Sequence, residues 1–165
     1  MVSRPACCVD RLNGWIVEPT APTLMALAYD SATQFVAVAL KRSRIDGYGV
    51  FAAEAIPAGT RLGLLTGESI TVAEARRRAQ ESRRLMLVEL SPARAIDASR
   101  SQDAMRFTNH SCRPNARIQV EDGEVSFFAL QDLQPGDEIT VDYGVTHHEG
   151  RLPCRCGATG CRGAL

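Results

Sequence analysis

Three side chains that hydrogen-bond ligands or bind metals are crowded into residues 106–115, which read RFTNHSCRPN. Asn109 offers an amide, His110 an imidazole and Cys112 a thiol, so the run can serve a polar ligand, a metal ion or both. Taken alone, the run also fits an ordinary polar loop. The end of the chain adds three more thiols, so that Cys112 belongs to a possible set of four with Cys154, Cys156 and Cys161.

The C-terminal cysteines have the spacing C-x-C-x4-C, which supplies three ligands of a tetrahedral thiolate site for Zn²⁺. A site closed by four cysteines leaves no position for water and is therefore structural. In a reducing compartment the six cysteines of the chain favour metal ligands or free thiols over a disulfide framework. Disulfides are the alternative if the protein is exported.

The composition indicates one globular domain without a strong electric field. The chain has 165 residues, 45% of them hydrophobic, and its 19 basic residues balance its 19 acidic ones. This balance argues against nucleic acid as the main partner, because such binding depends on neutralised phosphates. Lys41 is the sole lysine, and we attribute the excess of arginine to GC-rich coding and hence to a bacterial source.

We expect a soluble, intracellular protein, located in the bacterial cytoplasm, with delivery into a host cell as an alternative. The N-terminus carries no clear export signal, and no apolar run approaches the roughly 18 to 20 residues of a membrane span. Residues 1–33 have no assignable chemistry. For the pair Cys7 and Cys8 we favour incidental thiols over a redox or metal site, and Trp15 with residues 24–27 suggests packing on the domain or on a second copy, as a homodimer.

Many short strands and one helix are expected, which makes the fold mostly β or β-rich α+β. The helix runs from Thr71, a predicted N-cap with Glu74 three residues later, to about Arg84. Asp122 and Gly123 form the turn of a predicted hairpin. Strands are expected at residues 34–40, 50–53, 61–66, 85–90, 94–98, 116–121, 125–130 and 138–143. The glycines at 47 and 49 fit either a tight hairpin or a close approach to a ligand.

From residue 34 to the C-terminus, the chain resembles the SET-domain protein lysine methyltransferases. Five motifs match in order, and they are residues 47–60, 96–98, 106–115, 127–144 and the cysteine tail. The resemblance implies small twisted β-sheets around a pseudoknot-like crossing, in which the segment with the tyrosine passes beneath the Asn-His loop. It also divides the chain into an N-terminal segment (1–33), a SET domain (34–146) and a post-SET zinc-binding tail (147–165).

The same resemblance implies S-adenosylmethionine as cofactor and lysine in a protein, possibly a histone, as substrate. Tyr143 matches the catalytic tyrosine, which orients the amine near the transferred methyl, and Cys112 matches the fourth zinc ligand beside the tail cysteines. His147 and His148 are assigned to a solvated linker. The matching cofactor-binding positions are Gly47, Tyr48, Gly49, Arg106, Phe107, Asn109 and His110.

The sequence departs from the family in two places. The cysteine-rich segment that commonly precedes the domain is missing, and Val141 stands where many members carry Phe or Tyr, which leaves the number of methyl groups added open. Two rival functions remain. One is a protein-interaction module that binds the cofactor but turns over weakly, against which the intact Tyr143 argues. The other is a zinc-dependent structural or nucleic-acid module, which the neutral charge disfavours.

Overall fold

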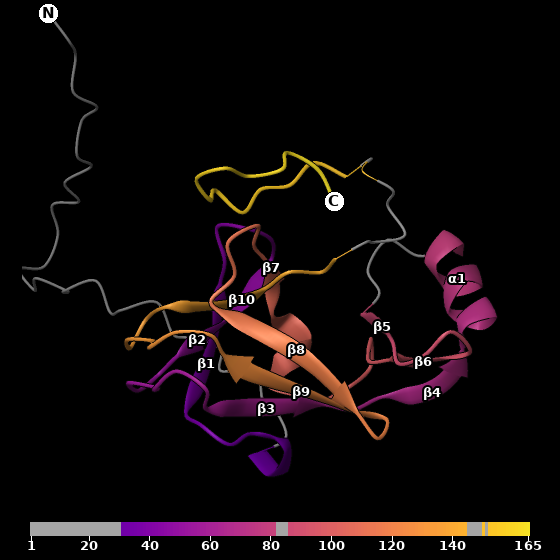
Figure 1. Cartoon of the computed structure of the whole chain (residues 1–165), viewed down its shortest axis with the longest axis horizontal. Coiled ribbons are helices and arrows are strands. Elements are labelled where there is room, and N and C mark those ends of the chain that lie inside the picture. Colours follow the sequence, from indigo (N-terminus) through magenta and orange to yellow (C-terminus); the bar gives the residue numbers. More distant parts are fainter. Residues whose placement is uncertain (1–30, 82–85, 145–149, 151) are drawn as a thin grey trace, which may run out of the picture.

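The structure is a computed structural model that describes residues 31–81, 86–144, 150 and 152–165. Within these residues the chain forms short strands, one α-helix and two 3₁₀ helices, which confirms the mostly β expectation (Figure 1). None of the described helices is long and apolar enough to cross a membrane. In chain order the elements are η1 (Ser31–Thr33), β1 (Val38–Arg42), β2 (Tyr48–Ala52), β3 (Arg61–Leu65), β4 (Glu68–Thr71), α1 (Val72–Glu81), β5 (Leu87–Glu89), β6 (Arg94–Asp97), η2 (Ala104–Phe107), β7 (Asn109–His110), β8 (Ala116–Glu121), β9 (Glu124–Ala129) and β10 (Glu138–Val141).

The sheet that carries the sequence motifs has the strand order β1-β2-β10-β7. Strand β10 is inserted between β2, to which it is antiparallel, and β7, to which it is parallel. The Asn115 side chain closes over β10 by donating to the Glu138 carbonyl at 2.8 Å and accepting from the Thr140 amide at 2.8 Å. Segments far apart in the sequence therefore meet in one sheet.

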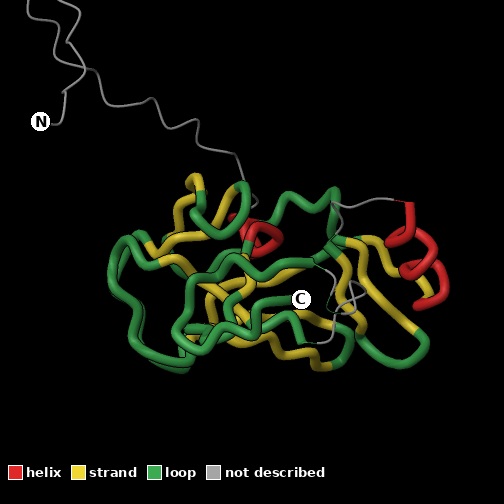
Figure 2. The backbone as a smooth tube through the Cα atoms, turned by 90° about the horizontal axis from the view of Figure 1, so that it is seen from above, coloured by secondary structure: helices red, strands yellow, loops and turns green. Residues whose placement is uncertain are grey.

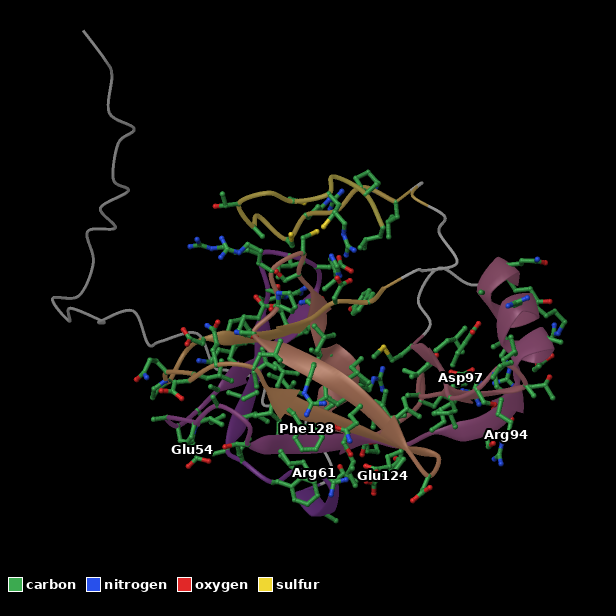
Figure 3. All side chains as sticks on the ribbon, in the orientation of Figure 1. Glu54, Arg61, Arg94, Asp97, Glu124 and Phe128 are labelled. Atoms are coloured by element: carbon green, nitrogen blue, oxygen red, sulfur yellow. The ribbon has the colours of Figure 1, made fainter. Side chains whose placement is uncertain are left out.

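A second sheet, with the order β3-β9-β8, supplies much of the core. Strand β9 is tightly buried on its inner face, where Val125 and Phe127 have no exposed surface. On the outer face Arg61 of β3 pairs with Glu124 of β9, near Phe128 (Figure 3). The predicted β8–β9 hairpin is confirmed, since Asp122 and Gly123 both have positive φ angles, 51° and 82°, as a type I′ turn requires.

The third sheet, β4-β6-β5, carries α1 at one end of the molecule (Figures 1 and 2). The predicted N-cap is confirmed, because the Thr71 hydroxyl accepts a hydrogen bond from the Glu74 amide at 3.1 Å. The Glu74 carboxylate does not complete a capping box and pairs instead with Arg77 and Arg78. The predicted end of the helix, at Arg84, lies outside the described residues.

Arg78 fastens α1 to this sheet. Its guanidinium contacts Glu74 at 2.9 Å, Glu68 at 2.8 Å and Asp97 at 2.7 Å, which come from α1, β4 and β6. Asp97 lies on β6 and is only 9% exposed in its side chain (Figure 3). Because the Asp97 carboxylate is largely withdrawn from water, this pair is less screened than a surface ion pair.

Apart from strand ends that shift by one or two residues, such as the end of β10 at Val141 where 143 was expected, four differences separate the expected elements from those observed. Gln34 forms only an isolated bridge with Gly63, and β1 begins later, at Val38. The Asn-His pair, expected in a loop, forms the two-residue strand β7, because β10 offers it a parallel edge. Strand β4 was not expected, and it forms by pairing with β6. Strand β5 (Leu87–Glu89) is shorter than expected.

A buried carboxylate joins three parts of the core. Asp103 is 2% exposed and accepts hydrogen bonds from the Thr33 hydroxyl at 2.7 Å and from the backbone amide and hydroxyl of Thr66. Burial alone would raise the pKa of Asp103, but these donors outweigh it and lower the pKa below its usual range. The carboxylate therefore stays ionised in the folded protein.

Replacing Asp103 with asparagine is expected to lower the free energy of unfolding by about 1 to 3 kcal/mol, because an NH₂ group would face donors. The pKa in the folded state lies below the unfolded value of about 3.9, so this contribution is present above roughly pH 4 and is lost as the pH falls through the folded pKa. Urea unfolding at pH 7 and pH 3 would measure it. The control is Asp122→Asn in the exposed turn, and an Asp103→Asn difference that does not shrink at pH 3 would contradict the assignment.

The C-terminal tail folds back on itself above the sheet that contains β7 and β10 (Figure 1, yellow). Pro153 bridges Ala164, the Cys154 amide donates to the Gly163 carbonyl at 3.0 Å, and the Leu165 amide donates to the Leu152 carbonyl at 2.8 Å. Glycines with positive φ, among them Gly157 and Gly160, allow the tight reversals between these pairs. The fold thus brings the tail cysteines near residues 110–112.

Candidate functional site

Asn109 gathers three acceptors at the centre of the site. Its Nδ2 lies 3.2 Å from the Asp46 carbonyl, 3.1 Å from the Tyr48 carbonyl and 2.8 Å from Glu138 Oε1. Glu138 Oε1 also accepts from the Ser43 hydroxyl at 2.7 Å. Because an amide nitrogen carries two hydrogens, three acceptors around it retain capacity for a further donor. This corner suits a positively charged amino group.

The two glycines beside Asn109 serve different purposes: the tight hairpin is confirmed at Gly47, and the close approach at Gly49 is to protein side chains. Gly47 has φ 43° and closes the turn between β1 and β2, where its carbonyl accepts from the Ser43 amide. Gly49 lies within β2, and a Cβ built there would sit 2.3 Å from Glu138 Oε1 and 3.2 Å from Asn109 Nδ2. Only glycine lets Glu138 and Asn109 approach the strand this closely.

Tyr143 follows β10 and reaches the same region. Its hydroxyl donates to the Thr108 carbonyl at 2.8 Å, and the residue remains 38% exposed. Burial of the hydroxyl, with smaller effects from Asp46 and Glu138, raises the pKa of Tyr143 to about 12. The side chain is therefore a neutral phenol at pH 7, able to accept a hydrogen bond on its oxygen but not to act as a base.

His110 is 2% exposed and lies between Tyr143 and Cys112. Its Nδ1 accepts from the Tyr143 backbone amide at 3.1 Å, and its Nε2 lies 3.3 Å from Cys112 Sγ. Burial lowers the pKa of His110, so the ring is neutral at pH 7. Both ring nitrogens thus face groups of the protein.

Four cysteines converge where the tail meets β7. The Sγ atoms of Cys112, Cys154, Cys156 and Cys161 lie within 4.8 Å of one another, and all four thiols are free. Cys112 Sγ is 3.8 Å from Cys154 Sγ and 3.9 Å from Cys161 Sγ. Zinc at 2.3 Å from four sulfurs in a tetrahedron sets them about 3.8 Å apart. The cluster therefore fits this metal.

The thiols of the cluster differ in acidity. Burial raises the pKa of Cys154 to about 12. Burial also acts to raise that of Cys156, but backbone hydrogen bonds from Cys112 and Ala158 outweigh it and lower the pKa to about 6. Metal binding requires thiolates and so releases protons. Cys156 is the thiol that already favours the charged form.

Arg162 and Glu138 were missed by the sequence interpretation. Arg162 Nη2 donates to Asp142 Oδ1 at 2.7 Å and lies 3.4 Å from His110 Nε2, while the Arg162 amide lies 3.4 Å from Cys112 Sγ. The sequence did offer a signal for each residue: Arg162 follows Cys161, and Glu138 begins the last predicted strand. It does not indicate which side chains they contact.

Arg106 and Phe107 lie on η2, which packs against β2. Arg106 donates to the Ser101 carbonyl at 2.7 Å and stacks over the Phe107 ring at 4.6 Å, so its guanidinium holds the loop before η2. Val141 is fully buried in β10 and pairs with His110 in register. His147 and His148 lie outside the described residues.

Comparison with known proteins assigns more than half of the chain to one family. The SET domain family matches residues 47–144. The chain is 35% identical over 133 residues to Histone-lysine N-methyltransferase set-2 of Caenorhabditis elegans, covering 75% of this chain and 9% of that protein. It is 34% identical over 129 residues to Histone-lysine N-methyltransferase ASHH1 of Arabidopsis thaliana, covering 72% and 26%.

A third relative is Histone-lysine N-methyltransferase, H3 lysine-4 specific, of Aspergillus oryzae, with 34% identity over 140 residues, or 78% of this chain and 11% of that protein. The chain thus spans between 9% and 26% of the length of these three relatives. The family match at residues 47–144 contains Asn109 and Tyr143, whereas the tail cysteines lie beyond it.

Proposed function

This chain belongs to the SET-domain family, and from that premise we propose that it transfers a methyl group from S-adenosylmethionine to the ε-amine of a lysine in a protein substrate. The observation that carries the proposal is the meeting of Tyr143, Asn109 and the glycine motif of β2 around β10. Three sequence-distant motifs converge there on a corner rich in acceptors. Such convergence is expected of an active site.

The residues around Asn109 fit S-adenosylmethionine. The Asp46 and Tyr48 carbonyls and Glu138 suit the amino group of its methionine part, and Gly47, with no atom within 4 Å of a Cβ position, leaves the backbone open there. Arg106, Phe107 and His110 would hold the remainder, mainly through the backbone of η2 and β7. When bound, the cofactor supplies the electrophilic methyl group.

Tyr143 would orient the lysine amine. Its proton is directed to the Thr108 carbonyl, so the phenol oxygen is left to accept a hydrogen bond from the amine. Deprotonating a lysine of pKa about 10.4 at pH 7 costs about 4 to 5 kcal/mol. Since Tyr143 is itself protonated, the amine loses its proton to water, and burial near a positive charge lowers that cost.

The tail would bind Zn²⁺ through Cys112, Cys154, Cys156 and Cys161 in a structural role. The support is the fit of the sulfur separations to a tetrahedral site. This gives residues 147–165 the role of a post-SET tail that closes over a domain of residues 34–146. A cytoplasmic, bacterial setting, the absence of nucleic-acid binding and a homodimer remain predictions.

The names of the relatives make histones the first candidate substrates. We expect labelled methyl transfer from S-adenosylmethionine to lysine on a peptide array that carries histone tails and other basic segments, with lysine-to-arginine peptides as control. Cofactor binding, measured by calorimetry, without transfer to any peptide or protein would contradict the enzyme and favour the interaction module.

A further inference from the structure

Two contacts tie the cysteine cluster and its tail to the segment that carries Tyr143. One is the ion pair between Arg162 Nη2 and Asp142 Oδ1, at 2.7 Å, formed by the residues next to Cys161 and Tyr143. The other is His110, with Nδ1 at 3.1 Å from the Tyr143 amide and Nε2 at 3.3 Å from Cys112 Sγ. Arg162 therefore joins the tail to the segment of Tyr143, and His110 joins that segment to Cys112 of the cluster.

The donors fix the protonation of His110. A backbone N–H can only donate, so Nδ1 must be the unprotonated acceptor of the Tyr143 bond. In a neutral imidazole the proton then lies on Nε2, which faces Cys112 Sγ. A metal in the cluster would hold Cys112 as a thiolate, and a charged acceptor would strengthen this bond. Arg162 Nη2 lies 3.4 Å from Nε2 but donates its shorter bond to Asp142 Oδ1, at 2.7 Å, and its positive charge interacts with the same sulfur.

We propose that His110 is a positioning residue that couples the four-cysteine cluster to Tyr143, through Nε2–H to the Cys112 thiolate and Nδ1 to the Tyr143 amide. Occupation of the cluster by metal orders Cys112, Cys112 fixes the ring, and the ring fixes the backbone from which Tyr143 projects. The Arg162–Asp142 pair holds the same two segments together beside it. The catalytic role of Tyr143 rests on the proposed function, whereas the coupling does not.

Two substitutions of His110 test its two hydrogen bonds separately, because each retains a polar atom near one ring nitrogen. An asparagine side chain reaches as far as Nδ1 and a glutamine side chain as far as Nε2. In the zinc-loaded protein, His110→Asn should keep an acceptor for the Tyr143 amide but lose the bond to Cys112, so its zinc affinity should fall about 10- to 100-fold. His110→Gln should keep zinc affinity within a few-fold, shift the Tyr143 amide signal in the ¹⁵N NMR spectrum and lower kcat.

The wild-type protein offers a test that needs no variant. The ¹⁵N shifts of the His110 ring should report an unprotonated Nδ1 and a protonated Nε2 at neutral pH. A proton on Nδ1 would overturn the proposal, even if both variants fail to fold. Equal losses of zinc and equal shifts of the Tyr143 amide in the two variants would also overturn it.

The readouts distinguish this proposal from the proposed function. Zinc affinity, measured by competition with a chelator, and the Tyr143 amide signal require no turnover. If no substrate is methylated while His110→Asn loses zinc and His110→Gln shifts the amide, the coupling stands and the methyltransferase assignment fails. If methyl transfer is robust and both variants match the wild type in every readout, the coupling fails alone.

Discussion

Replacing Tyr143 with phenylalanine is expected to lower kcat for methyl transfer by about 10²-fold or more, while the affinity for S-adenosylmethionine changes little. The hydroxyl is directed by its bond to the Thr108 carbonyl at 2.8 Å, and without it the lysine amine loses its acceptor. Misplacing a reacting group by about 1 Å can cost 10²-fold in rate. Single-turnover transfer to the best peptide, with cofactor affinity from calorimetry, measures both quantities.

A loss of stability must be separated from this loss of catalysis. Removing the Tyr143–Thr108 bond also costs about 1 kcal/mol of folding free energy. Thr71→Ala serves as the matched control, because it removes the bond from the Thr71 hydroxyl to the Glu74 amide at the start of α1 and costs a similar amount. The control should be destabilised by about 1 kcal/mol and keep its kcat.

A small effect of Tyr143→Phe on kcat would contradict a catalytic role for Tyr143. A kcat within about threefold of wild type would correspond to less than about 0.7 kcal/mol of lost transition-state stabilisation. Loss of the acceptor that orients the amine should cost more than this. In that case Tyr143 is a structural residue on the edge of the site, and another group must align the substrate.

The sequence predicted well those elements whose cause is local. Thr71 caps its helix and the Asp122–Gly123 turn adopts positive φ because each depends on a few neighbouring atoms. It predicted poorly those that depend on a distant partner. Strand β7 exists because β10 lies beside it, and β4 exists because β6 does. A strand of two residues is too short to show an alternation of hydrophobic residues, and its composition does not indicate which strand it pairs with.

The same division applies to the site. The spacing of the tail cysteines indicated a metal site, and the described structure brings all four predicted cysteines within 4.8 Å. The position of the His110 ring was not predictable, since it depends on the Tyr143 amide and the Cys112 sulfur, which come from different segments. Residue types therefore revealed which groups are present, and topology decided which of them meet.

Replacing Cys112 with serine is expected to have the largest effect on the metal. Cys112 is the one ligand of the cluster outside the tail, so its loss leaves only tail residues on the ion. Loss of a group around the ligands costs about 10- to 100-fold in metal affinity, and loss of a ligand itself should cost more than 100-fold. Zinc content after dialysis against a chelator measures the change.

Cofactor affinity should fall together with zinc affinity in Cys112→Ser. Without the fourth thiolate, the tail is held over the sheet only by weaker contacts, among them the exposed Arg162–Asp142 pair, and surface ion pairs contribute about 0 to 1 kcal/mol. The control is Thr71→Ala, which removes a hydroxyl at the start of α1 and leaves the four cysteines in place, so it should retain zinc and cofactor. If Cys112→Ser loses zinc and still binds S-adenosylmethionine as tightly as wild type, the tail is not a wall of the cofactor site, and metal binding serves only the fold of the tail.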